Sequence, residues 1–220
     1  MTKVKICGLT QETHVAAAVA AGADYLGFVF ANSRRFITAD AAKKITTRVP
    51  AAIHKVGVFV QPTFIDIKHT CDIVGLSHIQ LHGTITPSVQ QALEKGAFQQ
   101  LDVSVIQAFN GEALDLKEKL QSSLADFILL DAPADTTAYA GGNGQTFNWH
   151  IAAKEHTVSK PLFVAGGLNL TNVQQAITCF TPYAVDISSG VETNGTKDSA
   201  KITAFIQKVK ELSINETTNE

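Results

Sequence analysis

The sequence predicts a single (β/α)8 barrel, the TIM-barrel architecture of the α/β class. Short runs rich in Val, Ile and Phe alternate with segments whose apolar residues recur at helical spacing, and this alternation is typical of parallel βα units. Eight such repeats follow one another with no Pro- or Ser-rich linker and no break in composition. These observations favour one closed barrel over two half-domains, with an open doubly wound sheet as the alternative architecture.

Eight short apolar runs are the expected strands of the barrel. They occupy residues 4–7, 25–30, 55–60, 78–82, 103–109, 127–131, 162–165 and 184–188. The segments between them are expected to contain helices that each turn one apolar stripe toward the sheet. Two of these stripes are Phe64, Ile67, Cys71 and Val74, and, near the end of the chain, Ile202, Phe205, Val209 and Leu212.

Residues suited to helix starts precede several of the periodic segments. A Thr side chain can accept a hydrogen bond from the unpaired amides of a first turn, so Thr38 and Thr171 are expected caps. Proline suits a first turn because its missing N–H would have no partner there, and Pro62 is expected in that position. The barrel domain is predicted to span residues 1–212. Residues 213–220 are polar with almost no apolar anchor and are expected to form a disordered tail.

The composition of the 220 residues excludes several classes of protein. Hydrophobic residues make up 45% and charged residues 17%, which is typical of a globular domain. A net charge of −2 and a pI near 6.4 offer no basic surface for nucleic acid or an anionic membrane. The longest uncharged stretches are interrupted by polar residues, so no membrane-spanning helix is expected. Small-molecule chemistry is therefore the expected function.

The protein is expected to be cytoplasmic. The first residues carry charges, but no apolar signal core follows them. Cys7, Cys71 and Cys179 are scattered along the chain and make no disulfide framework, so reduced thiols are expected.

Polar residues and glycines follow the expected strands at the end where (β/α)8 barrels place their chemistry. These candidate site residues are Cys7, Arg35, His82, Asp131, Gly166, Gly167, Ser188 and Ser189. No lysine ends a strand, which weakens a Schiff-base mechanism. His78 and His82 would be about 13 Å apart in a strand, unlike a zinc-binding pair on a helix, and no metal site is expected.

Cys7 and Asp131 are the candidates for proton transfer, and each has a plainer interpretation. A free cysteine is commonly a small core residue, but Cys7 ends the first strand and is followed by Gly8, where the backbone can turn sharply. Asp131 ends an apolar run and could cap a turn, or burial could raise its pKa enough to make it a proton donor. Both alternatives stay open on the residues alone.

Two further features could bind anions. Gly166, Gly167, Ser188 and Ser189 follow strands seven and eight, where barrels frequently hold phosphate on backbone amides, although tight turns are the alternative interpretation. Arg35 could be a solvated loop charge, or its planar fork could hold a carboxylate.

Several short motifs occur in a fixed order along the chain. The first are Lys5-Ile6-Cys7-Gly8-Leu9-Thr10, Gly27-Phe28-Val29-Phe30 with Ser33-Arg34-Arg35, and Val56-Gly57-Val58-Phe59-Val60. The later ones are Gln80-Leu81-His82-Gly83, Asp131-Ala132 with Gly141-Gly142-Asn143-Gly144, Ala165-Gly166-Gly167-Leu168, and Val185-Asp186-Ile187-Ser188-Ser189-Gly190-Val191-Glu192. In their order and barrel positions these motifs resemble the phosphoribosylanthranilate isomerase family of tryptophan biosynthesis, over nearly the whole chain.

The resemblance implies a cofactor-free Amadori rearrangement of N-(5'-phosphoribosyl)anthranilate to 1-(2-carboxyphenylamino)-1-deoxy-D-ribulose 5-phosphate. It implies that Asp131 is the general acid that opens the ribose ring and that Cys7 is the general base that removes the C2 proton. Arg35 would hold the anthranilate carboxylate, and His82 would be a wall of the site. Backbone around the glycines at 166 and 167 and the serines at 188 and 189 would hold the phosphate.

Two alternative functions stay open. Another phosphosugar-processing barrel enzyme would share the phosphate loops, but it usually needs a metal set, a lysine or paired carboxylates at strand ends. A barrel that only binds a phosphorylated ligand would have no need of both Cys7 and Asp131.

The expected partner is a small phosphoribosyl substrate, and neither nucleic acid nor a membrane is expected to bind. The chain is expected to be a monomer that could associate with other enzymes of the pathway. The loop of residues 132–147 is long enough to be a mobile cover over the site.

Overall fold

The computed structural model of the chain describes residues 1–133, 146–155 and 159–217. Eight parallel strands close into one barrel in the order of the sequence. They are β1 (Lys3–Cys7), β2 (Tyr25–Val29), β3 (His54–Val60), β4 (His78–His82), β5 (Ser104–Asn110), β6 (Phe127–Asp131), β7 (Leu162–Val164) and β8 (Ala184–Ile187). The predicted (β/α)8 barrel is confirmed, and each predicted strand boundary agrees with the structure to within one residue.

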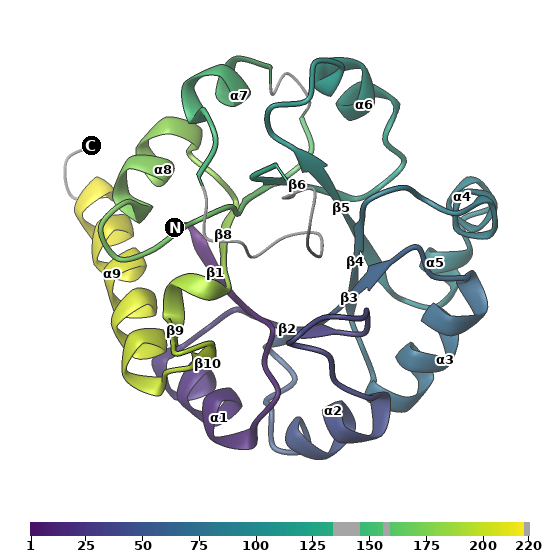
Figure 1. The fold of residues 1–220 in the computed structure, drawn as a ribbon, viewed down its shortest axis with the longest axis horizontal. Coiled ribbons are helices and arrows are strands. Elements are labelled where there is room, and N and C mark those ends of the chain that lie inside the picture. Colours follow the sequence, from purple (N-terminus) through teal and green to yellow (C-terminus); the bar gives the residue numbers. More distant parts are fainter. Residues whose placement is uncertain (134–145, 156–158, 218–220) are drawn as a thin grey trace.

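A ring of helices surrounds the strands (Figure 1). The helices are α1 (Glu12–Ala21), α2 (Ala39–Ile45), α3 (Phe64–Val74), α4 (Pro87–Glu94), α5 (Ala97–Gln100), α6 (Leu116–Ser122), α7 (Trp149–Glu155), α8 (Val173–Phe180) and α9 (Ser199–Thr217). A short 3-10 turn (Ser189–Val191) and a hairpin of β9 (Glu192–Thr193) and β10 (Thr196–Lys197) connect β8 to α9. The last helix packs beside α1 and covers the seam between β8 and β1 (Figure 1).

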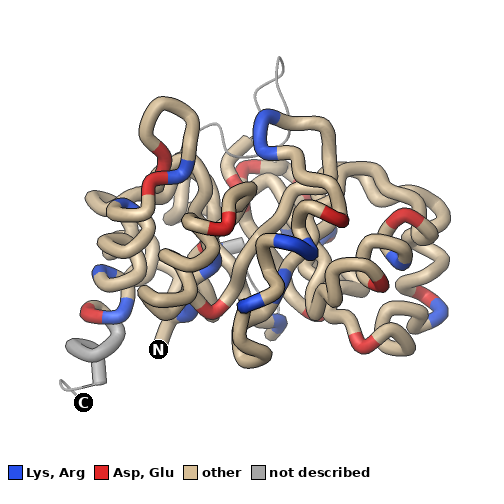
Figure 2. Tube along the Cα trace, turned by 90° about the horizontal axis from the view of Figure 1, so that it is seen from below, with Lys and Arg blue, Asp and Glu red and all other residues tan. Residues whose placement is uncertain are grey.

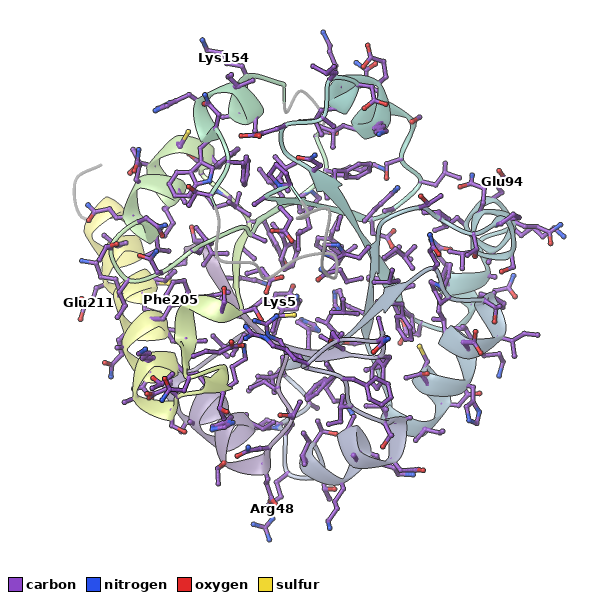
Figure 3. All side chains as sticks on the ribbon, in the orientation of Figure 1. Lys5, Arg48, Glu94, Lys154, Phe205 and Glu211 are labelled. Carbon is purple, nitrogen blue, oxygen red and sulfur yellow. The ribbon has the colours of Figure 1, made fainter. Side chains whose placement is uncertain are left out.

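The apolar stripes predicted on the helices face the barrel. Ile67 on α3 and Phe205 on α9 are both completely buried. In Figure 3, Phe205 lies between α9 and the strands, whereas the charged Arg48 and Glu211 point away from the barrel. Burial of such a stripe stabilises each helix more than its intrinsic propensity does.

Helix starts agree with the sequence in one of three predicted cases. Thr38 caps α2 through its side-chain oxygen, as predicted. The prediction for Pro62 is wrong because Thr63 caps α3 in a reciprocal capping box, which leaves the proline outside the first turn. The prediction for Thr171 is wrong because its hydroxyl donates to Asn169 at 2.7 Å instead of capping α8.

Two expectations concern segments that the structure describes only in part. Helix α9 reaches Thr217, so residues 213–217 are helical and differ from the expected disordered tail, while residues 218–220 lie outside the described residues. The domain boundary at residue 212 stays a prediction. Most of the loop after β6, with its glycine motif, also lies outside the described residues, and its role as a cover stays a prediction.

The interior of the barrel divides into two halves of different chemistry. Near the N-terminal ends of the strands, Tyr25, Phe163 and Ala184 belong to an apolar cluster that fills the barrel. Lys5 and Cys7 lie further along β1, and since side chains alternate along a strand, both face the interior. The polar side chains that line the cavity lie beyond this filling, toward the C-terminal ends of the strands.

Charged residues are distributed over the outside of the molecule. Figure 2 shows Lys and Arg interspersed with Asp and Glu along the chain, in keeping with the net charge of −2. Within the described ranges, no helix combines the length and the apolar character that crossing a membrane requires.

The fold makes a prediction about the last helix. Phe205→Ala is expected to lower the free energy of unfolding by about 3–5 kcal/mol, because it removes a fully buried ring between α9 and the barrel. Leu114→Ala is the matched control, since Leu114 is fully exposed and its loss should change stability by no more than about 0.5 kcal/mol. Urea unfolding measures both, and equal effects of the two variants would contradict the packing described.

Candidate active site

One cavity of about 710 Å³ opens at the C-terminal ends of the strands. Residues at the ends of β1, β2, β4, β6, β7 and β8, or in the loops after them, contribute to its wall. All eight predicted site residues line it: Cys7, Arg35, His82, Asp131, Gly166, Gly167, Ser188 and Ser189. The structure thus gathers these eight residues, which end strands or follow them, in one place.

Cys7 ends β1 at the cavity and is only 8% exposed. The next residue, Gly8, has a φ of +77°, and a Cβ there would lie 2.5 Å from Cδ of Arg35. A glycine is therefore needed for the sharp turn. The Ser188 hydroxyl donates a hydrogen bond of 3.1 Å to the Cys7 carbonyl oxygen, which places the loop after β8 next to the thiol. Burial raises the pKa of Cys7, and the positive charge of Lys5 is the largest influence that opposes it.

Asp131 ends β6 and faces the same cavity. Its Oδ1 accepts a 2.8 Å hydrogen bond from the amide of Ala132, and its Oδ2 lies 3.5 Å from Nε2 of His82. Burial, and then the charge of Asp186, raise the pKa of Asp131 to about 6. Burial, and then the charge of Lys5, lower the pKa of His82 to about 4. His82 is therefore neutral at pH 7, and beside it Asp131 can hold or release a proton near neutral pH.

The loop after β7 approaches the end of β6 closely. Gly166 and Gly167 both have positive φ, of +78° and +63°. A Cβ on Gly166 would lie 2.5 Å from the amide nitrogen of Ala132, so no other residue fits there without moving the backbone next to Asp131. The tight-turn interpretation of these glycines is correct as geometry. Such turns also leave backbone amides open to a close approach by an anion.

Arg35 is fixed by a residue that the sequence had not singled out. Its Nε and Nη2 donate to the two carboxylate oxygens of Glu192, at 2.7 and 3.2 Å. The same carboxylate accepts from Arg34 at 2.8 Å and from Lys197 at 2.7 Å. Burial opposes ionisation of Glu192, but hydrogen bonds from Arg35 and Lys197 outweigh it and hold the pKa of this carboxyl below its ordinary value. Lys197 also donates to the carbonyl and hydroxyl of Ser188, so this cluster connects the Arg35 loop to the loop after β8.

Three more residues of the barrel interior were missed by the sequence analysis as members of the site. The ammonium of Lys5 donates to Asp186 Oδ2 at 2.6 Å and to Gln80 Oε1 at 2.8 Å. Lys5 is completely buried, while Gln80 and Asp186 line the cavity from below Cys7. One signal could have found them, namely a charged residue two positions before Cys7 on the same face of an otherwise apolar strand.

Across residues 1–133, 146–155 and 159–217, no group of three or more His, Cys, Asp or Glu side chains is arranged to hold a metal ion.

Fold and cavity together place the protein among the (β/α)8-barrel enzymes, with a thiol, a carboxyl group and an arginine at one strand-end cavity. The family model for N-(5'-phosphoribosyl)anthranilate (PRA) isomerase matches residues 4–208. The chain therefore belongs to the N-(5'-phosphoribosyl)anthranilate isomerase family, and the resemblance seen in its motifs is confirmed.

Relatives with similar sequence and structure agree with this assignment. An N-(5'-phosphoribosyl)anthranilate isomerase of Streptococcus pneumoniae is 44% identical over 210 residues, which cover 96% of this chain and 96% of that protein. The crystal structure of phosphoribosyl anthranilate isomerase from Thermotoga maritima is 36% identical, has a TM-score of 0.84 and covers 96% of this chain and 100% of its own. Another crystal structure is of a phosphoribosyl anthranilate isomerase in complex with reduced 1-(o-carboxyphenylamino)-1-deoxyribulose 5-phosphate. It is 33% identical with a TM-score of 0.77, over 96% of this chain and 100% of that one.

Proposed function

We propose that this protein catalyses the rearrangement of N-(5'-phosphoribosyl)anthranilate to 1-(2-carboxyphenylamino)-1-deoxy-D-ribulose 5-phosphate, a step of tryptophan biosynthesis. The observation that carries the proposal is that Cys7 and Asp131 line one cavity from β1 and β6 in a chain of this family. Another phosphosugar barrel enzyme and a barrel without catalytic activity are not favoured, because the relatives reported above are isomerases of one kind.

In the proposed reaction Asp131 is the general acid. Its proton goes to the ribose ring oxygen, the bond from C1 to that oxygen breaks, and the nitrogen lone pair forms a C1=N iminium. A carboxyl group must be protonated to do this near neutral pH, and the raised pKa of Asp131, about 6, supports the assignment. The neutral His82 beside it would shape the wall of the site without competing for the proton.

Cys7 is the proposed general base. Its thiolate takes the proton from C2, the electrons of that bond form a C1=C2 double bond, and the iminium nitrogen recovers its lone pair. The enol then becomes the ketone by moving a proton from the C2 hydroxyl to C1. All electrons come from the substrate itself, so the proposed reaction needs no cofactor.

The substrate would be held at its two anionic ends. Arg35 would bind the anthranilate carboxylate, and the guanidinium is already oriented by Glu192. Backbone around Gly166, Gly167, Ser188 and Ser189 would bind the phosphate, in the loops after β7 and β8.

The remaining expectations follow from this function. A biosynthetic enzyme with three free cysteines fits the cytoplasm. We propose that the protein acts as a monomer on a small phosphoribosyl substrate, with residues 1–212 as its catalytic domain. We also propose that this monomer can associate with other enzymes of the pathway.

Cys7→Ala is expected to lower kcat by about 10² to 10⁴, because it removes the base, while binding of the reduced product analogue is kept. Cys71→Ala is the matched control, since Cys71 is an equally buried cysteine on α3 that does not line the cavity. Turnover is followed spectroscopically with substrate generated in place. An alanine variant that keeps most of its turnover would mean that Cys7 is only a core residue.

The pH dependence tests the opposed protonation states. The productive enzyme has Asp131 protonated and Cys7 ionised, although Asp131 has a pKa of about 6 and the pKa of Cys7 is raised. As pH rises between these values, loss of the acid is balanced by gain of thiolate. We therefore expect kcat/KM to rise up to about pH 6, to stay level, and to fall only at alkaline pH.

Asp131→Asn is expected to abolish ring opening and to remove the alkaline fall, because the group lost there is the acid. Any residual activity should keep rising with pH as Cys7 ionises. A variant with native turnover, or one that keeps the alkaline fall, would assign the acid to another residue.

The two anionic ends can be tested separately. Arg35→Ala should strongly weaken the binding of the reduced product analogue and hardly change the binding of ribulose 5-phosphate, because only the analogue carries the carboxylate. Arg34→Ala is the matched control, since Arg34 binds the same Glu192 but its side chain is 55% exposed.

Ser189→Asp should not distinguish the two ligands. It should weaken the binding of both equally, because a carboxylate beside the phosphate that they share repels it. Gly166→Val is unsuitable for this purpose, since its side chain would collide with the backbone of Ala132 next to Asp131. Isothermal titration measures both ligands. Equal losses in Arg35→Ala for the two ligands would contradict the two-ended binding.

A further inference from the structure

A buried ion pair below the cavity has no part in the proton transfers proposed above. Lys5 on β1 is completely buried, Asp186 on β8 is 7% exposed, and their charged atoms are 2.6 Å apart. The register of the two strands places the residues directly opposite each other. Figure 3 shows Lys5 inside the ring of strands. Because taking two charges out of water is costly and apolar residues often replace such pairs without loss, stability alone does not account for the pair.

Lys5 is held next to the sulfur of Cys7. The two residues are two positions apart on β1, so both side chains point into the barrel. An ammonium has three N–H donors, and Asp186 and Gln80 accept two of its hydrogen bonds. The same ammonium is the strongest positive influence on the thiol of Cys7, since its charge lowers the pKa of that thiol more than the charge of Lys197 does. Two hydrogen bonds to groups on β4 and β8 therefore fix the cation inside the barrel, on the same face of β1 as the thiol that is proposed to carry negative charge.

Among the described residues, the other charged groups around Cys7 do not replace Lys5. Lys197 of β10 lowers the pKa of the Cys7 thiol less than Lys5 does. The ammonium of Lys197 is itself paired with the Glu192 carboxylate, at 2.7 Å. Asp186 raises the pKa of Cys7, again by less than Lys5 lowers it. On the remaining walls of the cavity, His82 is neutral and Asp131 must carry a proton in the reaction. The guanidinium of Arg35 is paired with Glu192.

We propose that Lys5 is the electrostatic partner of the base: its ammonium, held by Asp186 and Gln80, stabilises the negative charge on the Cys7 sulfur before the C2 proton is taken. This inference rests on the proposed function. The proton moves from C2 to sulfur, while Lys5 keeps its own protons and makes no bond to substrate. Lys5 is therefore a positioning residue rather than a catalytic one.

The test measures the thiolate directly. Iodoacetamide reacts with thiolate and not with thiol, so the alkylation rate of Cys7, followed by peptide mass spectrometry from pH 7 to pH 10.5, reports its ionisation. In Lys5→Met the profile should move to higher pH by at least about one unit, which makes alkylation at pH 8 about tenfold slower. Lys3→Met is the matched control, because Lys3 is on the same face of β1 but donates to Tyr183; its profile should equal that of the wild type. Cys179 serves as the internal reference.

A second variant guards against loss of folding, since Lys5→Met leaves Asp186 as a buried unpaired charge. The double variant Lys5→Met/Asp186→Asn removes both charges, and its Cys7 should still react more slowly than that of the wild type. A folded Lys5→Met or double variant with an unchanged or faster profile overturns the proposal. Isomerase activity plays no part in this readout: an inactive wild-type enzyme would overturn the proposed function, whereas the alkylation profiles alone decide the role of Lys5.

Discussion

The pairing of β8 with β1 is the contact on which the arrangement of the cavity depends. Four residue pairs join the two strands, from Lys3 and Ala184 to Ile6 and Ile187. In an open sheet, these strands would be the two edges of the molecule. Closure brings Ser188 to the carbonyl of Cys7 and sets Lys5 opposite Asp186, so residues from the two ends of the chain share one site. The long helix α9 crosses this seam and packs on α1 and β1. A C-terminal helix therefore supports the strand that carries Cys7.

Burial in the barrel favours the protonated form of the proposed acid, Asp131, and disfavours the ionised form of the proposed base, Cys7. The apolar filling below and the covered walls disfavour charge, so burial raises the pKa of both Asp131 and Cys7. For an acid that must stay protonated, this shift is useful. For a base that must lose its proton, the same shift is an obstacle, and a nearby cation opposes it without opening the site to water. In our proposal Lys5 supplies this positive charge from within the barrel, two residues before Cys7 on β1, where solvent does not screen it.

The sequence predicted the framework well because the framework follows from periodic apolar patterns. Strand-end position located eight residues that line the cavity, since a (β/α)8 barrel has one functional face. Lys5 and Asp186 were missed because they lie inside strands, where a pattern of apolar runs assigns residues to the core. Glu192 and Lys197 were missed because two-residue strands are too short to show a period. Pro62 was misplaced because a capping box in the neighbouring residues decided the helix start.

The cluster around Glu192 adds a charge argument to the two-ended substrate. Arg34, Arg35 and Lys197 share this one carboxylate, so among the described residues of this cluster three positive charges meet one negative charge, an excess of two. The chain as a whole has a net charge of −2, and this excess is therefore local to the cavity. The proposed substrate is anionic at both ends, and a local positive rim on a weakly acidic protein would attract it to this face rather than to the surface at large. Lys197 also donates to Ser188, so the cluster around Glu192 links the Arg35 loop to the loop proposed to hold the phosphate.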